Sequence, residues 1–196
     1  MGKQTGRVIV IGPYLRTRRN DPDAREESHA IRGSEARLEE AAGLARAIDL
    51  TIADGLIAQV SQITPATYLG KGKVEEIVGL VASHEAELVI MDCALSPIQQ
   101  RNLEKAWRTK VLDRTGLILE IFGRRAKTKE GALQVELAHL NYQRSRLVRS
   151  WTHLERQRGG FGFMGGPGET QIEADRRLIG DRITRLESDL IGTPRY

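Results

Sequence analysis

Basic and apolar side chains gather around one glycine-rich segment, and this combination suits contact with RNA. Six of the ten residues from Gly159 to Gly168 are glycine. Arginines neutralise phosphates, and aromatic or methionine side chains stack on or wedge beside unpaired bases. We therefore predict that this loop (residues 159–168) and its flanks bind RNA, the alternative being an ordinary tight connection between helices. The candidate residues are Arg156, Arg158, Gly159, Gly160, Phe161, Phe163, Met164, Gly168, Glu169, Arg176 and Arg177.

Two other groups of residues could hold a ligand. The run Gly70-Lys71-Gly72-Lys73 opens a predicted helix, where glycines and lysines can bind an anion such as a phosphate. A plain helix start with surface lysines is the alternative. Asp92 and Asp113 end two predicted strands, at the edge where open α/β sheets place ligands. Capping or loop roles are the alternative for these two carboxylates.

Motifs for catalysis and for metal binding are missing. The sequence contains no phosphate-binding loop of the form G-x-x-x-x-G-K-[ST], and no G-x-G-x-x-G opens a helix. The four histidines and the single Cys93 are scattered, without the spacing of a zinc site. The paired glutamates lie in charged surface contexts and suggest no acid–base couple. We predict no catalytic residue, no metal ligand and no cofactor in this chain, with ATP binding in its N-terminal part as the alternative.

Two long helices must position the glycine loop. The first, over about 128–158, places its larger apolar residues at alternating steps of four and three, which is a heptad seam. The second is expected to begin with a capping box, Thr170-x-x-Glu173, and to end at Gly192. The two seams pair when Leu154 lies opposite Ile172 and Leu137 opposite Leu190. Residues 124–192 are therefore predicted to form an antiparallel two-helix coiled coil.

The first part of the chain, residues 1–123, has a different pattern. Apolar runs at 7–12, 50–63, 88–92 and 110–113 indicate strands, and helices are predicted at 34–48, 71–84, 97–108 and 115–123. Alternating strands and helices predict an α/β fold with a four-stranded, mainly parallel sheet flanked by helices. Asp54-Gly55 breaks the second run, so a bulge or a short hairpin is expected there. The highly charged segment 16–33 is expected to be a long surface loop.

The charge is distributed unevenly between these two parts. Residues 124–196 carry 14 Lys and Arg against 9 Asp and Glu, whereas residues 1–123 carry 16 against 17. The basic excess surrounds the glycine loop, as expected for contact with phosphate backbones, although a solvated helix surface is the alternative. One cysteine excludes an internal disulfide and fits a reducing cytosol. No run approaches the ~20 apolar residues of a membrane span and no secretory signal is present, so we expect a cytoplasmic protein.

Several segments carry a resemblance to a known family. They span nearly the whole chain, and the last of them is very specific. The segments are Thr67–Ile77, Leu95–Lys105, Val111–Thr115, Glu130–Ala138 and Gly165–Arg177. Through them the sequence resembles the N-terminal region of the HflX GTPases, which are ribosome-associated translational GTPases. The loop departs from the family pattern, in which a small residue, Thr and Arg stand about where Phe163, Met164 and Gly165 stand here.

This resemblance implies a function in translation. It implies an α/β subdomain, a helical hairpin and then a GTPase domain, with residues 193–196 starting the linker to it. The hairpin loop would contact 23S rRNA of the large (50S) ribosomal subunit, and the protein would split or rescue stalled ribosomes. GTP and Mg²⁺ would belong to the GTPase domain, so this chain alone should not hydrolyse GTP. ATP binding by residues 70–73 is also implied by some members of the family.

We expect the protein to be a monomer. Besides ribosome binding, two other functions stay open at this point. An ATP- or nucleotide-binding α/β module would use the N-terminal part of the chain. A protein–protein module, in one form self-associating, would use the coiled coil instead of RNA contacts.

Overall fold

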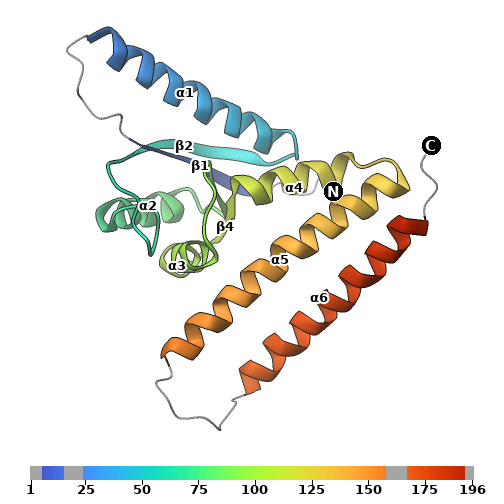
Figure 1. Ribbon diagram of the computed structural model, residues 1–196. Coiled ribbons are helices and arrows are strands. Elements are labelled where there is room, and N and C mark those ends of the chain that lie inside the picture. The colour runs from blue at the N-terminus through green and yellow to red at the C-terminus, as the bar shows by residue number, and fades with distance from the viewer. Residues whose placement is uncertain (1–5, 16–23, 158–166, 193–196) are drawn as a thin grey trace. The chain divides into compact units, whose positions relative to one another are not determined.

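A computed structural model describes the backbone of residues 6–15, 24–157 and 167–192, and the side chains of residues 6–15, 33–146 and 176–191. The chain divides into two compact units, Met1–Ile121 and Phe122–Tyr196. The first unit is built on a sheet, and the second is made of helices (Figure 1).

The first unit contains a parallel four-stranded sheet. Its strands are β1 (Arg7–Leu15), β2 (Thr51–Val60), β3 (Leu88–Met91) and β4 (Lys110–Asp113). The spatial order is β2-β1-β3-β4, and every pairing is parallel. The predicted α/β class and four-stranded sheet are therefore confirmed. A parallel sheet follows from the sequence pattern because a helix separates each strand from the next.

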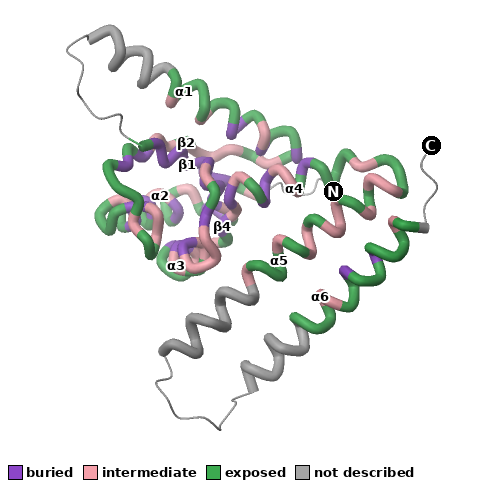
Figure 2. Tube along the Cα trace, viewed as in Figure 1, coloured by how far each residue is buried: buried purple, intermediate pink, exposed green. Residues whose placement is uncertain are grey.

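Helices cover both faces of this sheet. On one face α1 (Ala24–Arg46) and the start of α4 (Arg114–Arg125) pack against Val8, Val10 and Ile90. On the other face α2 (Lys71–Ser83) and α3 (Pro97–Trp107) pack against the alternate residues of the same strands, such as Ile9 and Met91. Strands buried on both faces explain why their sequences are continuously apolar rather than alternating. The buried residues concentrate in the sheet and the inner sides of these helices (Figure 2).

The predicted irregularity in the second strand is a bulge. Val8 pairs with Ile52, whereas Ile9 pairs with Asp54, so Ala53 is an extra residue in β2. The carboxylate of Asp54 accepts a 2.8 Å hydrogen bond from the backbone N–H of Gly55. The strand continues in the same direction past this point, which excludes the hairpin alternative.

Two boundaries in the first unit differ from the prediction. Helix α1 begins at Ala24, inside the segment expected to be a surface loop. Charged residues of both signs at helical spacing stabilise a helix as well as they solvate a loop. Strand β1 continues through Pro13 to Leu15. Its pairing with β3 ends at Ile11, so Pro13 lies where one neighbour is already absent and a missing N–H costs little.

The second unit consists of the end of α4, then α5 (Lys129–Gln157) and α6 (Pro167–Gly192). Thr128 caps α5, because its Oγ1 accepts a 3.0 Å hydrogen bond from the N–H of Gly131. Helix α6 begins at Pro167, so Thr170 lies inside the helix and the predicted capping box is wrong. Proline suits the first helical position because its φ angle is already helical and its missing N–H needs no partner there.

Helices α5 and α6 lie side by side and run in opposite directions (Figure 1). Ile183 and Leu186 of α6 are buried. Arg182 forms an ion pair with Glu136, with 2.7 Å between Nη2 and Oε1. The predicted register would instead bring Glu136 close to Leu190, about two helical turns away, and is therefore wrong by about one heptad. A slide by one heptad keeps apolar residues facing one another, so the seam alone does not select the register.

Candidate functional site

Five of the eleven predicted RNA-binding residues belong to the described parts of α5 and α6. Arg156 belongs to the last turn of α5, and Gly168 and Glu169 belong to the first turn of α6, although their side chains lie outside the described residues. Arg176 and Arg177 are exposed on α6. The remaining candidates, Arg158, Gly159, Gly160, Phe161, Phe163 and Met164, lie outside the described residues.

The candidate anion site at Gly70–Lys73 opens α2. Gly70 is the N-cap residue and has an extended backbone, with no side chain capping the helix. Lys73 pairs with Glu76 at 2.6 Å, and Lys71 approaches Glu75 at 3.8 Å. Both lysines therefore have carboxylate neighbours on their own helix, which favours the plain helix start over an anion site.

Asp113 has a structural role at the end of β4. Its side chain is buried, and its two oxygens accept hydrogen bonds from the backbone N–H groups of Gly116 at 2.9 Å and Leu95 at 3.1 Å. These bonds hold the start of α4 and the segment after β3. The carboxylate is thus occupied by capping, which was the alternative to a ligand site.

Asp92 joins four elements of the first unit. One carboxylate oxygen accepts a 2.8 Å hydrogen bond from the phenol of Tyr14 on β1, and the other accepts from Nη1 of Arg114 at the start of α4. Arg114 also donates through Nη2 to Glu40 of α1, at 2.8 Å. Because Asp92 is only 3% exposed, its charge depends on these partners.

Electrostatics and space around Tyr14 support this network. Burial raises the pKa of Tyr14 well above its ordinary value, and the hydrogen bond to Asp92 adds to the shift. The phenol therefore stays protonated and donates. Gly12 makes room for the ring, since a Cβ there would lie 2.6 Å from two ring carbons of Tyr14. The Arg37 guanidinium lies over the same ring, with its Cζ 4.1 Å from the ring centroid.

These side chains surround a hollow of about 430 Å³ at the carboxyl ends of the strands. It lies between β1 and β3, where the chain order reverses and open α/β sheets bind ligands. Its lining residues are Pro13, Tyr14, Leu15, Arg37, Glu40, Tyr68, Asp92, Cys93 and Arg114. Sequence reasoning found Asp92 but missed Tyr14, because the predicted strand ended at Gly12, and it gave no role to Arg37 or Arg114. The position of Arg114 directly after a predicted strand was a signal that could have placed it at this edge of the sheet.

The chemistry of this hollow is that of binding. Burial raises the pKa of the Cys93 thiol to about 12, and the carboxylates of Asp113 and Asp92 add to the shift, so the thiolate nucleophile is absent at neutral pH. Asp92 is engaged by Tyr14 and Arg114, which leaves it no role as a base. Within the described ranges, no three His, Cys, Asp or Glu side chains converge as they would to hold a metal ion. Nor does any helix described there combine the length and apolar character needed to cross a membrane.

Comparison with known families gives two matches that together cover most of the chain. Residues 35–123 match the family described as GTP-binding GTPase N-terminal, and residues 125–193 match the GTP-binding GTPase middle region. The border between the two matches lies close to the border between the two structural units.

Relatives and solved structures agree with these matches. The chain is 55% identical over 153 residues to GTPase HflX of Magnetococcus marinus, covering 78% of this chain and 35% of that protein. It is 56% identical over 126 residues to GTPase HflX of Escherichia coli, covering 64% and 29%. The chain thus spans about a third of the length of these relatives. A GTP-binding protein from Sulfolobus solfataricus, solved with GDP, shares the fold with a TM-score of 0.60 at 18% identity, over 96% of this chain and 45% of that one.

Proposed function

This chain belongs to the HflX family of GTPases, and on that premise we propose that it is the part of such a GTPase that binds the large (50S) ribosomal subunit. The loop between α5 and α6 would contact 23S rRNA, and the whole protein would split or rescue stalled ribosomes. The observation that carries the proposal is the helix pair itself. Arg176 and Arg177 are exposed on α6, and the sequence that connects the two helices is rich in glycine and contains two phenylalanines.

The helix pair suits delivery of a loop to a recessed surface. We propose that α5 and α6 form an antiparallel coiled coil, held by the buried Ile183 and Leu186 and by the Arg182–Glu136 ion pair. At about 1.5 Å per residue, α5 is roughly 43 Å long. A stiff support of this length can carry a glycine-rich loop into a crowded RNA site.

The catalytic part of the proposal lies outside this chain. No G-x-x-x-x-G-K-[ST] motif occurs in its sequence, so its own residues do not fit GTP with Mg²⁺. We propose that the complete protein carries a GTPase domain that holds both, that it acts in the cytoplasm as a monomer, and that this chain alone does not hydrolyse GTP.

Pelleting with isolated large subunits tests ribosome binding. The wild-type chain should co-sediment, and the Arg156→Ala/Arg158→Ala variant should bind more weakly. The affinity of this variant should also fall less steeply with rising salt concentration. The change in slope should correspond to one or two lost phosphate contacts, because each contact releases counterions. The matched control, Lys105→Ala/Lys110→Ala, removes two exposed cations from the first unit and should bind like wild type. Failure of the wild type to pellet with subunits would overturn the proposal.

A second candidate function is nucleotide binding by the first unit, and the hollow between β1 and β3 favours it. Calorimetry with ATP should be carried out on the wild type, on Arg37→Ala and on Lys71→Ala/Lys73→Ala. Weakened binding by Arg37→Ala alone would place the nucleotide in the hollow, and weakening by the lysine variant would place it at the start of α2. If the wild-type chain gives no heat of binding with ATP, nucleotide binding is excluded as the second function.

The helix pair could instead bind protein, as a self-associating module. Light scattering decides this, because self-association would give the mass of a dimer where we expect a monomer. Ribosome binding that survives nuclease digestion of the RNA would likewise favour a protein partner.

A further inference from the structure

Positive charge is concentrated where α4 passes into α5. We call residues 122–143, which comprise the end of α4 and the first half of α5, the elbow. Four of the six residues from Arg124 to Lys129 are Lys or Arg, and all four are exposed. These four cations lie at the opposite end of α5 from the glycine loop, roughly 40 Å away along the helix. Any contact it makes is therefore separate from that of the loop.

Three cations of the elbow have no carboxylate partner within the described part of the chain, in contrast to several cations of the first unit. In the first unit Arg7 pairs with Glu85, Arg46 with Glu39 and Lys73 with Glu76. Among the described residues, by contrast, no carboxylate pairs with Arg125, Lys127 or Lys129.

The carboxylates near these three cations are engaged elsewhere. Glu130 accepts a 3.2 Å hydrogen bond from Gln134, and Glu136 pairs with Arg182 of α6. Neither carboxylate forms an ion pair with Arg125, Lys127 or Lys129, so these three cations are available to an anionic partner.

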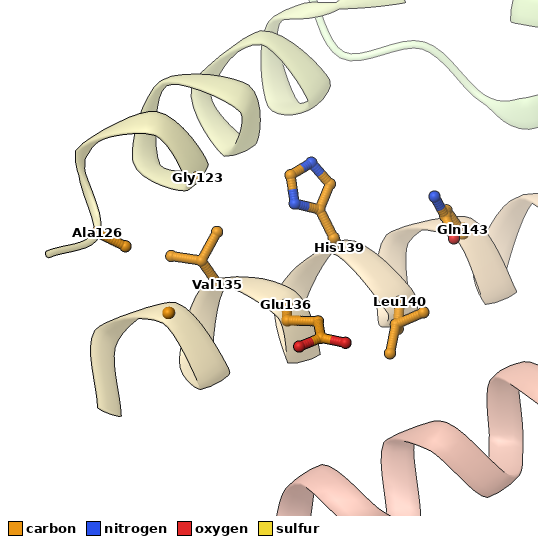
Figure 3. Close-up of a pocket in the computed structure, with 8 residues that line it drawn as sticks. Gly123, Ala126, Val135, Glu136, His139, Leu140 and Gln143 are labelled. Atoms are coloured by element: carbon orange, nitrogen blue, oxygen red, sulfur yellow. The ribbon is translucent and has the colours of Figure 1, made fainter. Parts of the chain in front are cut away.

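An apolar hollow of about 330 Å³ lies beside this charge. Figure 3 shows Val135 and His139 pointing from α5 toward α4, near Gly123. The absence of a side chain at Gly123 keeps the hollow open, since a Cβ there would lie 3.8 Å from both His139 and Val135. Gln143 offers an amide at the same side of the helix (Figure 3). The hollow thus combines apolar walls, an imidazole ring and one amide.

We propose that the elbow is a second RNA-binding surface, in which Arg125, Lys127 and Lys129 contact phosphates and the hollow takes one unpaired base. A base can stack on the imidazole of His139 and hydrogen-bond to the amide of Gln143, as single-stranded RNA does on proteins. The concave hollow suits a flat base, whereas a membrane would find one protruding large apolar side chain among the described residues of the elbow, Phe122, which is 56% exposed. RNA also suits the cations better than an apolar protein segment, which would leave their charge without partners.

The test uses fluorescence anisotropy of this chain with a 12-nucleotide single-stranded RNA and with the matching duplex, at several salt concentrations. Arg125→Ala/Lys127→Ala/Lys129→Ala should weaken binding of both RNAs and reduce the salt slope by about 2. The matched control, Arg101→Ala/Lys105→Ala/Lys110→Ala, removes the same kinds of charge from exposed positions of the first unit and should change neither.

A second variant separates the hollow from the charge. Ala132→Leu fills the hollow from an exposed position and keeps every cation. It should weaken binding of the single strand about fivefold or more, by removing one stacked base, and leave duplex binding unchanged. Equal affinities of the triple variant and its matched control would overturn the inference, and an Ala132→Leu variant that binds single strands like wild type would overturn the role of the hollow.

These outcomes are distinct from a failure of the proposed function. If the wild type binds large subunits and the triple variant does so with unchanged affinity and salt slope, the elbow is not an RNA contact while ribosome binding through the loop stands. If the wild type does not bind large subunits, the affinities for the two RNAs still decide the inference by themselves.

Discussion

The phenol of Tyr14 donates a 2.8 Å hydrogen bond to Oδ2 of Asp92, across the junction of β1 and β3. Both residues are buried, and they lie 78 positions apart in the sequence. Arg114 donates to the other oxygen of the same carboxylate. This arrangement holds the carboxyl edge of the sheet together, and several expectations about stability and reactivity follow from it.

Tyr14→Phe should lower the free energy of unfolding of the first unit by about 1–3 kcal/mol, because a buried carboxylate loses one of its donors. Unfolding of this unit in urea can be measured by the fluorescence of buried Trp107, in a Trp151→Phe background that removes the other tryptophan. In an Asp92→Asn background the same change should cost less, giving a coupling energy of at least about 0.5 kcal/mol. Additive effects of the two changes would contradict the bond.

Gly12→Ala should also destabilise the first unit, by about 1–3 kcal/mol, because the added Cβ would lie 2.6 Å from two ring carbons of Tyr14. The ring would have to move away from Asp92. Combining Gly12→Ala with Tyr14→Ala removes the clash, so Gly12→Ala should then cost much less. The matched control is Gly79→Ala in α2, where a Cβ meets nothing within 4 Å and helix propensity favours alanine. Equal losses from the two glycine substitutions would count against the steric argument.

Cys93 should react slowly with iodoacetamide in the folded protein. Burial raises the pKa of its thiol to about 12, so at pH 8 the thiolate is at least a hundredfold scarcer than in an exposed cysteine. Because the chain has a single cysteine, mass spectrometry reports the rate directly. The same protein unfolded in urea is the control and should react at the rate of a free thiol. Similar rates in the two states would refute the shift.

The pKa shift of Cys93 also predicts sensitivity to alkaline pH. The thiol of the unfolded chain, with its ordinary pKa of 9.0, loses its proton first, while the folded thiol keeps it up to about pH 12. The unfolded state therefore binds fewer protons in this window, and the free energy of unfolding falls as the pH rises from about 9 toward 12. Cys93→Ala should reduce the slope of stability against pH between 9 and 10. An unchanged slope in this window would show that another group causes the loss.

The Arg182–Glu136 ion pair predicts the register of α5 and α6. Each charge reversal, Glu136→Arg or Arg182→Glu, should destabilise the second unit, and the double reversal should restore part of the loss. The coupling should be about 0.2–1 kcal/mol, since both side chains are partly exposed. Leu186→Ala, at a fully buried position, should cost about 2–4 kcal/mol, whereas Leu178→Ala at an exposed one should cost little. If paired substitutions showed a coupling energy between Glu136 and Leu190 and none between Glu136 and Arg182, the register predicted from the heptad seam would be supported.

Local patterns predicted most of the elements of this protein. The strand runs before Gly12 and Asp92, the Ser96-Pro97 helix start and the bulge near Asp54 all lie where expected. The boundaries that were wrong involve residues whose local preference is shared between two structures. Charged residues at 24–33 suit a helix as well as a loop, and Pro167 starts α6 before the capping box that the sequence offered.

Local sequence patterns are enough to specify the alternating strands and helices and the two long helices joined by a glycine-rich segment, because hydrophobic periodicity and helix-starting residues act over a few positions. Which side chains meet depends instead on how the elements pack. Tyr14, Asp92 and Arg114 converge because parallel strands bring their carboxyl ends to one edge. Arg182 meets Glu136 because a heptad repeat permits several registers, and packing of the whole helix pair selects one.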